Sequence, residues 1–327
     1  MQQSRQKKKE VKVMGKLHIS STPHIHQKGS STQSIMLDVV IALLPATVAG
    51  IVIFGLKALF TVLTCVISAV LSEFLFDLCV HKKQTVGDLS AVVTGLLLAL
   101  NLGTNVPLWQ CAFGSVFAIV VVKCLFGGLG KNIVNPAITA RVLMLLTFGA
   151  VGVAAKPAIV ELTSGATPLV ALNQGAEIAS KEAPSLLDLF LGLHGGAIGE
   201  TCALALIIGF VYLVVRKVIK WYVPTAYVAT VFLCYFLFGG FDAVFALQHV
   251  LAGGLLLGAI FMATDYVTTP FTNKGRVIFC IGAGLLTFAI RRFGTYPEGV
   301  SIAILTMNLL TPFINDFAKK KTLGGVK

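Results

Sequence analysis

The chain has one polar stretch whose residue types could carry a covalent modification, Thr-Ser-Gly-Ala-Thr-Pro-Leu at residues 163–169. Small residues flank the hydroxyl groups there, so the backbone is open and an enzyme or a bulky adduct could reach Thr167. Ser-Gly-Ala-Thr also occurs by chance, and the competing interpretation is a turn or helix cap around Ser164. The surroundings of this stretch therefore decide its significance.

Acidic residues in or beside apolar segments are the second set of candidates, because a charge at the centre of a membrane costs ~2.5–3.5 kcal/mol. Glu73 and Asp77 are spaced i, i+4 and would share one face of a helix. His81, Lys82 and Lys83 follow directly. We therefore favour an interfacial position, solvated or paired, over a place in an ion pathway.

Asp265 is the stronger candidate for binding an ion. It stands among the hydroxyl groups of Thr264, Thr268 and Thr269, and hard cations prefer oxygen ligands. Na⁺ is such a cation, so an ion pathway through Asp265 and a purely structural role are equally open.

Three other charged residues have simpler interpretations. Asp38 and Asp88 are expected at helix starts, where a carboxylate meets the helix dipole favourably. Arg141 is expected as an interfacial cation whose stem lies in the apolar layer, with a bound phosphate group as the alternative.

Cysteine and histidine give no sign of a metal site. The seven cysteines are scattered through apolar segments with no Cys-x-x-Cys pair, which favours small buried side chains over an iron–sulfur cluster. No His-x-x-x-His spacing falls on an expected helix.

The composition indicates that these residues lie in a membrane protein. Apolar residues make up 56% of the chain and charged residues only 12%, with a mean hydropathy of +0.87, whereas soluble domains carry about 25% charged residues. The 26 Lys and Arg residues exceed the 14 Asp and Glu residues, but they lie in short clusters between apolar runs. That pattern is typical of membrane topology, and we expect no nucleic-acid partner.

Apolar runs of about 17–25 residues, long enough to span a bilayer, predict an all-α polytopic membrane protein with about ten transmembrane helices. The third and fifth runs are marginal and could be broken or re-entrant. The first is too long and too late in the chain for a secretory signal. The ten runs are 35–56, 59–80, 87–104, 107–125, 136–155, 198–215, 222–240, 246–263, 276–291 and 298–315.

The distribution of positive charge orients these helices. With the N-terminus cytoplasmic, most of the 26 Lys and Arg residues fall inside, as the positive-inside rule requires. Both termini are then cytoplasmic, and the loop that carries Thr167 is extracytoplasmic. The residues that fall outside are Lys57, Lys156, Lys181, Arg291 and Arg292.

That loop divides the helices into two halves of five. Residues 95–100 (Gly-Leu-Leu-Leu-Ala-Leu) and 254–259 (Gly-Leu-Leu-Leu-Gly-Ala) stand in the third helix of each half. Halves with an odd number of spans insert in opposite orientations, which predicts two inverted five-helix repeats, although such apolar runs are common in membrane helices. The expected parts are an N-terminal segment at 1–34, a first repeat at 35–155, an extracytoplasmic loop at 156–197, a second repeat at 198–315 and a cytoplasmic tail at 316–327.

Five sequence blocks in a fixed order carry a resemblance over the whole chain. The chain resembles the D subunit of the bacterial Rnf ion-translocating oxidoreductase complex, and is similar to its homologue, the B subunit of the Na⁺-translocating NADH:quinone reductase. Length favours the Rnf protein, because the homologue has a longer N-terminal extension. The blocks are 17–24 with 35–36 and 42–46, then 88–99, 127–137, 262–270 and 294–300.

The resemblance implies a cofactor on the polar loop. In this family the threonine that ends Ser/Asp-Gly-Ala-Thr is esterified to the phosphate of FMN, so Thr167 would carry the flavin, with Ser164, Gly165 and Ala166 around it. The family's flavin transferase works outside the cytoplasm, where the charge distribution independently places this loop. A second, non-covalent flavin, riboflavin, is implied by the resemblance alone.

The resemblance also implies partners and a location. The expected partners are the other subunits of an Rnf complex, including an extracytoplasmic subunit with covalent FMN, together with the flavin transferase and the lipid bilayer of a bacterial inner membrane. Ferredoxin and NAD sites are expected on other subunits, because no glycine-rich dinucleotide fingerprint follows a strand here.

Two functions compete on this sequence. In the first, the chain passes electrons through the flavin on Thr167 and couples them to translocation of Na⁺ or H⁺. The candidates for the ion path are Asp265 and Thr264, with Glu73 and Asp77 as the less favoured pair. In the second, it is a flavin-free channel or secondary transporter on the same scaffold. The acceptor sequence favours the first, because a channel has no use for it.

Overall fold

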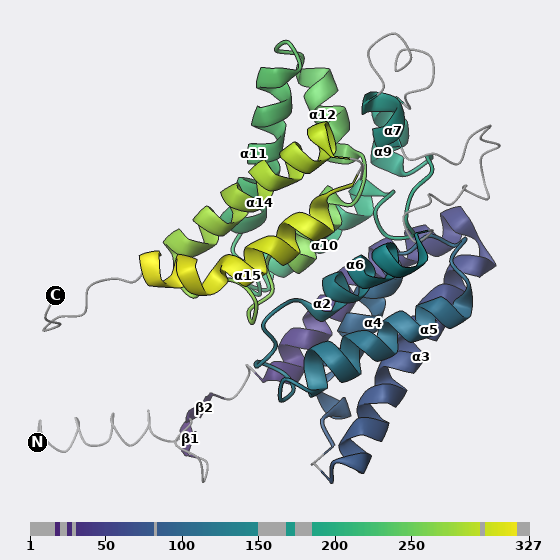
Figure 1. Ribbon diagram of the computed structural model, residues 1–327, viewed down its shortest axis with the longest axis vertical. Coiled ribbons are helices and arrows are strands. Elements are labelled where there is room, and N and C mark those ends of the chain that lie inside the picture. Colours follow the sequence, from purple (N-terminus) through teal and green to yellow (C-terminus); the bar gives the residue numbers. More distant parts are fainter. Residues whose placement is uncertain are drawn as a thin grey trace, which may run out of the picture.

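The computed structural model describes residues 17–19, 25–27, 31–81, 84–149, 168–173, 185–294 and 298–318, and helices dominate this part (Figure 1). The helices of the first half are α2 (Thr32–Phe54), α3 (Leu56–Cys79), η1 (Val86–Asp88), α4 (Ser90–Leu100), α5 (Leu108–Val116), η2 (Phe117–Cys124) and α6 (Pro136–Phe148). Those that follow are α7 (Pro168–Asn173), α9 (Leu186–Leu191), α10 (Ala203–Val215), α11 (Tyr222–Phe238), α12 (Ala243–Leu251), α13 (Leu255–Leu257), η4 (Gly258–Met262), α14 (Asn273–Phe293) and α15 (Val300–Ala318).

One pair of strands adds to the predicted all-helical fold. β1 (Leu17–Ile19) pairs antiparallel with β2 (Ile25–Gln27), with His18 opposite His26. Both strands lie in the predicted N-terminal segment, ahead of the helices, so they do not alter the helical character of the rest.

The helices differ in how well they could span a bilayer. Within the described residues, α2, α3 and α15 are long and apolar enough to cross a membrane, and α12 with residues 255–262 makes a fourth if that pair, bent by 68°, counts as one span. The predicted third and fifth spans are short: α4 has 11 residues and α6 has 13. At 1.5 Å per residue, α4 covers only ~16 Å of a ~30 Å apolar layer.

The outward faces of α2 and α3 are apolar. Leu44, Val48 and Val52 of α2 and Phe60 and Ile67 of α3 are all exposed. A monomeric soluble protein rarely leaves so continuous an apolar surface in water. This surface and the long apolar helices indicate a membrane protein with several spans.

Asp38 and Asp88 were both expected at helix starts, but only Asp88 lies at one. Asp88 stands at the start of α4, where its Oδ1 accepts the N–H of Ser90 at 2.9 Å, as predicted. The prediction for Asp38 was wrong, because α2 already begins at Thr32 and Ser31 caps it. Asp38 is buried in α2 and binds α10 instead, accepting from the Tyr212 hydroxyl at 2.9 Å and from Arg216 Nε at 3.1 Å.

The two halves meet along matching helices. α2 packs against α10, and α6 packs against α15, so that these four helices lie between the outer parts of the halves (Figure 1). Within each half the order of contacts is also alike, since α3 contacts α4 and α5 as α11 contacts α12 and α14.

The segment expected as the third helix of each half is short or interrupted. α4 ends at Leu100, and the following residues run without helix to Leu108. In the second half the chain breaks between α12 and α13, where Gly253 has a φ of 71°. A side chain there would be strained and would also collide with Leu169, because an added Cβ would lie 2.5 Å from its Cδ1.

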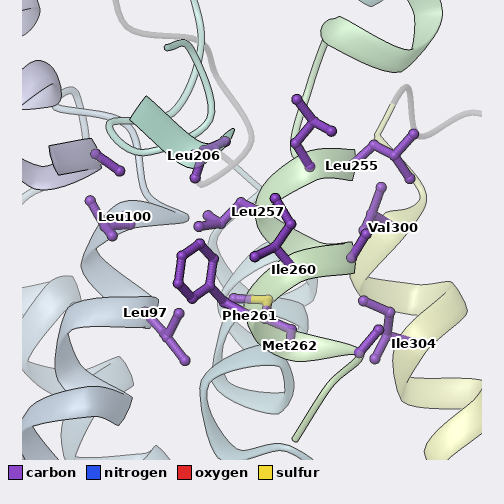
Figure 2. Packing of buried hydrophobic residues seen from close by; sticks show 14 of the residues in the cluster. Leu97, Leu100, Leu206, Leu255, Leu257, Ile260, Phe261, Met262, Val300 and Ile304 are labelled. Carbon is purple, nitrogen blue, oxygen red and sulfur yellow. The ribbon is translucent and has the colours of Figure 1, made fainter. Parts of the chain in front are cut away.

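The apolar core fills the space between these segments. Figure 2 shows Leu97 and Leu100 of α4 near Phe261 of η4, while Val300 and Ile304 of α15 lie beside η4. All five are buried. The core therefore packs η4 of the second half between α4 of the first half and α15.

Candidate functional site

The predicted flavin-bearing residues Ser164, Gly165, Ala166 and Thr167 lie outside the described residues. The described chain resumes at α7, which starts directly after Thr167 in sequence. Leu169 and Leu172 of α7 are buried in the core. Leu169 lies against Gly253 at the break between α12 and α13, so the helix that follows the motif is anchored beside the interrupted helix.

Asp265 lies in the loop after η4, within a set of hydroxyl groups. Its Oδ1 accepts the N–H of Val267 at 3.2 Å, and its Oδ2 accepts from the Thr268 hydroxyl at 3.0 Å. Burial raises the pKa of the Asp265 carboxyl, and these two donors partly oppose the shift. The Thr264 hydroxyl turns away, because it donates to the Ile260 carbonyl at 2.6 Å.

Glu73 and Asp77 are buried, not solvated at an interface. Glu73 Oε1 accepts from Lys123 Nζ at 2.7 Å and from the Thr85 hydroxyl at 2.7 Å. Asp77 Oδ2 accepts from the backbone N–H of Thr85 at 2.8 Å and from its hydroxyl at 2.9 Å. Lys123 also donates to the Ser90 hydroxyl. Glu73 therefore has an ion-pair partner, and Lys123 supplies the charge that permits its burial, whereas Asp77 is held by the two hydrogen bonds from Thr85.

A cavity of about 90 Å³ lies between the two acidic sites. Asp265 and Thr264 line it from the second half, and Lys123 and Ser90 line it from the first. The Glu73 network thus reaches the cavity through Lys123. A space of this size holds a few water molecules or a small cation.

Arg141 does not snorkel, which corrects the sequence prediction. It is 6% exposed, and its Nη2 forms an ion pair with Glu298 Oε2. Its Nη1 donates to Asn101 Oδ1 at 2.8 Å and to the Ser301 hydroxyl at 3.0 Å. Arg141 is on α6, and Ser301 is on α15. A buried guanidinium needs such partners, so Arg141 ties the first half to the second.

A second buried arginine lies in the same region. Arg291 donates from Nη1 to the His249 carbonyl at 2.7 Å, from Nη2 to the Ala252 carbonyl at 3.3 Å and from Nε to the Glu298 carbonyl at 3.0 Å. The first two bonds satisfy the C-terminal end of α12 before the break. Charge distribution alone assigned Arg291 to the outer side and could not predict these partners.

Sequence reasoning missed two acidic residues here, Glu200 and Glu298. Glu298 stands in the block at 294–300, and Glu200 starts the predicted span at 198–215. A lone carboxylate at the start of an apolar segment was the available signal for Glu200. The sequence could not show that Glu200 and Glu298 lie near Arg141, because Arg141 is far from both along the chain.

Cysteines and histidines form no metal site in the described part of the chain, where no three His, Cys, Asp or Glu side chains lie close enough to hold an ion. The cysteines are buried, except for exposed Cys79 and half-buried Cys202. His249 stacks on Tyr235, with ring centroids 3.9 Å apart.

Comparison with known proteins assigns the family. Residues 18–324 match the model of the NQR2, RnfD, RnfE family. The chain belongs to this family. The resemblance stated from the sequence blocks is thereby confirmed over nearly the whole chain.

Several relatives match almost end to end. The D subunit of the Na⁺-translocating ferredoxin:NAD⁺ oxidoreductase complex of Acetobacterium woodii is 48% identical, over 95% of this chain and 96% of the relative. The D subunit of the proton-translocating ferredoxin:NAD⁺ oxidoreductase complex of Clostridium ljungdahlii is 40% identical, over 94% of this chain and 96% of the relative. The D subunit of the ion-translocating oxidoreductase complex of Stutzerimonas stutzeri is 37% identical, over 90% of this chain and 93% of the relative.

Proposed function

We propose that this chain is the flavin-carrying membrane subunit of an ion-pumping electron-transport complex of the ferredoxin:NAD⁺ oxidoreductase type. The observation that carries the proposal is the end-to-end similarity to D subunits of such complexes. The chain would work with the other Rnf subunits, among them an extracytoplasmic subunit with covalent FMN, in a bacterial inner membrane with both termini cytoplasmic.

FMN esterified to Thr167 is the proposed electron carrier of this subunit. The acceptor sequence Ser164–Thr167 directly precedes α7, and buried Leu169 and Leu172 anchor that helix in the core. An anchor next to the attachment residue would limit where the flavin can lie, which electron transfer to a neighbouring subunit requires. The cofactor supplies the redox chemistry, and the protein supplies its position and surroundings. Riboflavin as a second, non-covalent flavin rests on the family resemblance.

The ion path is proposed to run past the cavity between Lys123 and Asp265. Asp265 and Thr264 line this cavity directly, while Glu73 and Asp77 join it through the ion pair with Lys123. Carboxylates buried in a membrane protein are costly and commonly mark ion routes. One relative is named as Na⁺-translocating and another as proton-translocating. The transported ion must therefore be determined on this protein.

The proposed inverted five-helix repeats give this path a mechanism. The matching contacts of α2 with α10 and of α6 with α15 support two related halves. In inverted-repeat transporters, movement of one half against the other opens a central site alternately to each side. A redox change at the flavin would bias that movement.

The alternative is a flavin-free channel or secondary transporter, and covalent flavin separates the two. Membranes that express the chain together with its flavin transferase are resolved on a denaturing gel and viewed under ultraviolet light. A fluorescent band at the mass of this chain that disappears in Thr167→Ala and persists in Thr163→Ala supports the proposal. A dark wild-type band supports the channel, and fluorescence that survives Thr167→Ala places the flavin elsewhere.

A further inference from the structure

Glu200 is held rigidly between the two interrupted segments. It stands in a turn before α10, where Ile198 N–H donates to the Leu102 carbonyl at 3.0 Å and Gly199 N–H donates to the Leu100 carbonyl at 2.8 Å. A Cβ on Gly199 would lie 2.5 Å from Leu100 Cβ, so the turn presses closely against the end of α4. Glu200 therefore has a fixed position and little freedom to reach solvent.

One oxygen of this carboxyl group has no hydrogen-bond donor. Glu200 is 2% exposed, and its Oε1 accepts the N–H of Ala197 at 2.9 Å. Its Oε2 is buried and accepts no hydrogen bond from a donor among the described residues, and the carboxyl group beside Glu200 is that of Glu298. An ionised carboxylate in this state would be costly, because a buried oxygen that carries charge needs a donor.

The unpartnered oxygen faces the break in the second half. Oε2 lies 3.0 Å from the position that a Cβ on Gly254 would occupy, and Arg141 Nη1 lies 3.6 Å from the same point. Gly254 directly precedes α13, so the oxygen lies beside the start of the second helical piece. In inverted-repeat transporters, the ends of discontinuous helices form the coupling-ion site.

Three charged groups act on Glu200 from the surrounding elements. They are Arg141 of α6, Glu298 before α15 and Arg291 of α14. Arg141 is already engaged by Glu298, and the three hydrogen bonds described for Arg291 go to backbone carbonyls. The two carboxyl groups therefore compete for Arg141.

We propose that the Glu200 carboxyl group binds and releases a proton between the interrupted segments, and that Arg141 exchanges between Glu298 and Glu200 as it does so. With the proton on Oε2, Glu200 is neutral and Arg141 holds Glu298, which is the arrangement in the structure. When the proton passes to a water molecule that enters the region, the O–H bond breaks, its electron pair stays on Oε2, the water becomes hydronium, and the carboxylate attracts Arg141.

The exchange would act on the contact between the halves. Arg141 connects α6 to Glu298 and Ser301, so a shift toward Glu200 weakens one link between α6 and α15. Proton release thereby loosens the packing of the halves near Gly254, where the second piece of the broken helix begins. The inference rests on the proposed function, since it assigns this proton to the ion-coupling cycle of the same protein.

Infrared difference spectroscopy on the intact membrane complex tests the proposal. Spectra of reduced minus oxidised complex should contain a carboxylic acid C=O band that shifts in D₂O, disappears in Glu200→Gln and remains in Glu200→Asp. Asp188→Asn is the control, because Asp188 is acidic and nearby in sequence but caps α9 through Ser185. Its spectrum should keep the band.

Ion transport in proteoliposomes provides the functional readout. Glu200→Gln mimics the protonated state, so the complex should assemble, keep its flavin fluorescence and lose most of its ion transport per electron transferred. A band that survives Glu200→Gln, normal coupling in that variant or its failure to assemble would each overturn the proposal. A wild-type chain without covalent flavin would instead overturn the proposed function, which keeps the two failures distinct.

Discussion

At the scale of single residues, buried charges in this protein are held in specific pairs. Glu73 with Lys123 and Arg141 with Glu298 each join segments distant in the chain. Sequence reasoning could find Glu73, because a carboxylate in an apolar run is costly and therefore conspicuous. It could not find Lys123 as its partner, since only the packing of α3 against η2 brings them together.

Removing the charge of Glu73 should destabilise the protein through Lys123. Glu73→Gln leaves a buried ammonium group without its counter-charge, and breaking such a pair costs about 3–5 kcal/mol. We expect a lower Tm and a smaller yield of assembled complex. The double variant Glu73→Gln, Lys123→Met should recover most of the loss, because it removes both charges. A single variant as stable as the wild type would contradict this account of the pair.

Asp265→Asn tests the ion pathway, because it keeps the shape of the side chain and removes its charge. Flavin attachment should be unchanged, while ion-coupled turnover slows or, if Na⁺ is the ion, a higher Na⁺ concentration is needed for half-maximal rate. Burial raises the pKa of Asp265, so protonation should compete with Na⁺ at a higher pH than for an ordinary aspartate. The Na⁺ requirement of the wild type should then rise as pH falls, and this dependence should be absent in Asp265→Asn.

Two outcomes would remove Asp265 from the path. One is normal ion-coupled turnover in Asp265→Asn, and the other is an equal response to pH in the wild type and the variant. Thr306→Val is a suitable control, because the Thr306 hydroxyl is exposed and bonds only to its own helix through the Ile302 carbonyl.

At the scale of helices and turns, the interrupted segments organise the site. The repeated Gly-Leu-Leu-Leu runs allowed the sequence to locate both segments, and the weakness of the third apolar run indicated that the first could be broken. The 68° bend was not predictable, because it depends on the positive φ of Gly253 and on contacts with Leu169 and Arg291. Local composition does not contain those tertiary contacts.

Gly253→Ala should disturb the break and the anchor of α7 together. The added Cβ would lie 2.5 Å from Leu169 Cδ1 and 3.2 Å from Arg291 Nη2, at a φ of 71°. Gly240→Ala is the matched control, because Gly240 has a φ of 77° and nothing within 4 Å of its added Cβ. The control should lose stability only through the added backbone strain, about 1–2 kcal/mol. Thermal unfolding should show a larger loss for Gly253→Ala, and equal losses would contradict the packing argument.

At the scale of the whole molecule, the charge distribution and the apolar runs predicted a helical membrane protein, and the family match supports that class. The bounds of the spans were predicted less well, since α4 and α6 are shorter than the apolar runs that predicted them. Hydropathy detects apolar residues whether they face lipid or another helix, so buried short helices and full spans look alike in sequence.

Membrane orientation is a prediction that labelling can check. A cysteine at Ser180 should react with a membrane-impermeant maleimide in intact cells or spheroplasts, and a cysteine at Ser4 should react only after the membrane is opened. The reason is the excess of Lys and Arg in the segments assigned to the cytoplasm. The opposite labelling pattern would place the Thr167 loop inside and out of reach of an extracytoplasmic transferase.

The central claim is that Thr167 carries FMN, and the mass of the peptide containing this residue tests it most directly. Peptides from the purified complex are fragmented to locate any added mass along residues 163–169. We predict a peptide heavier by FMN less one water, with the addition on Thr167 and riboflavin-containing fragments released from it. An unmodified peptide from a complex made with active transferase, or an addition on Thr163 or Ser164, would contradict the claim.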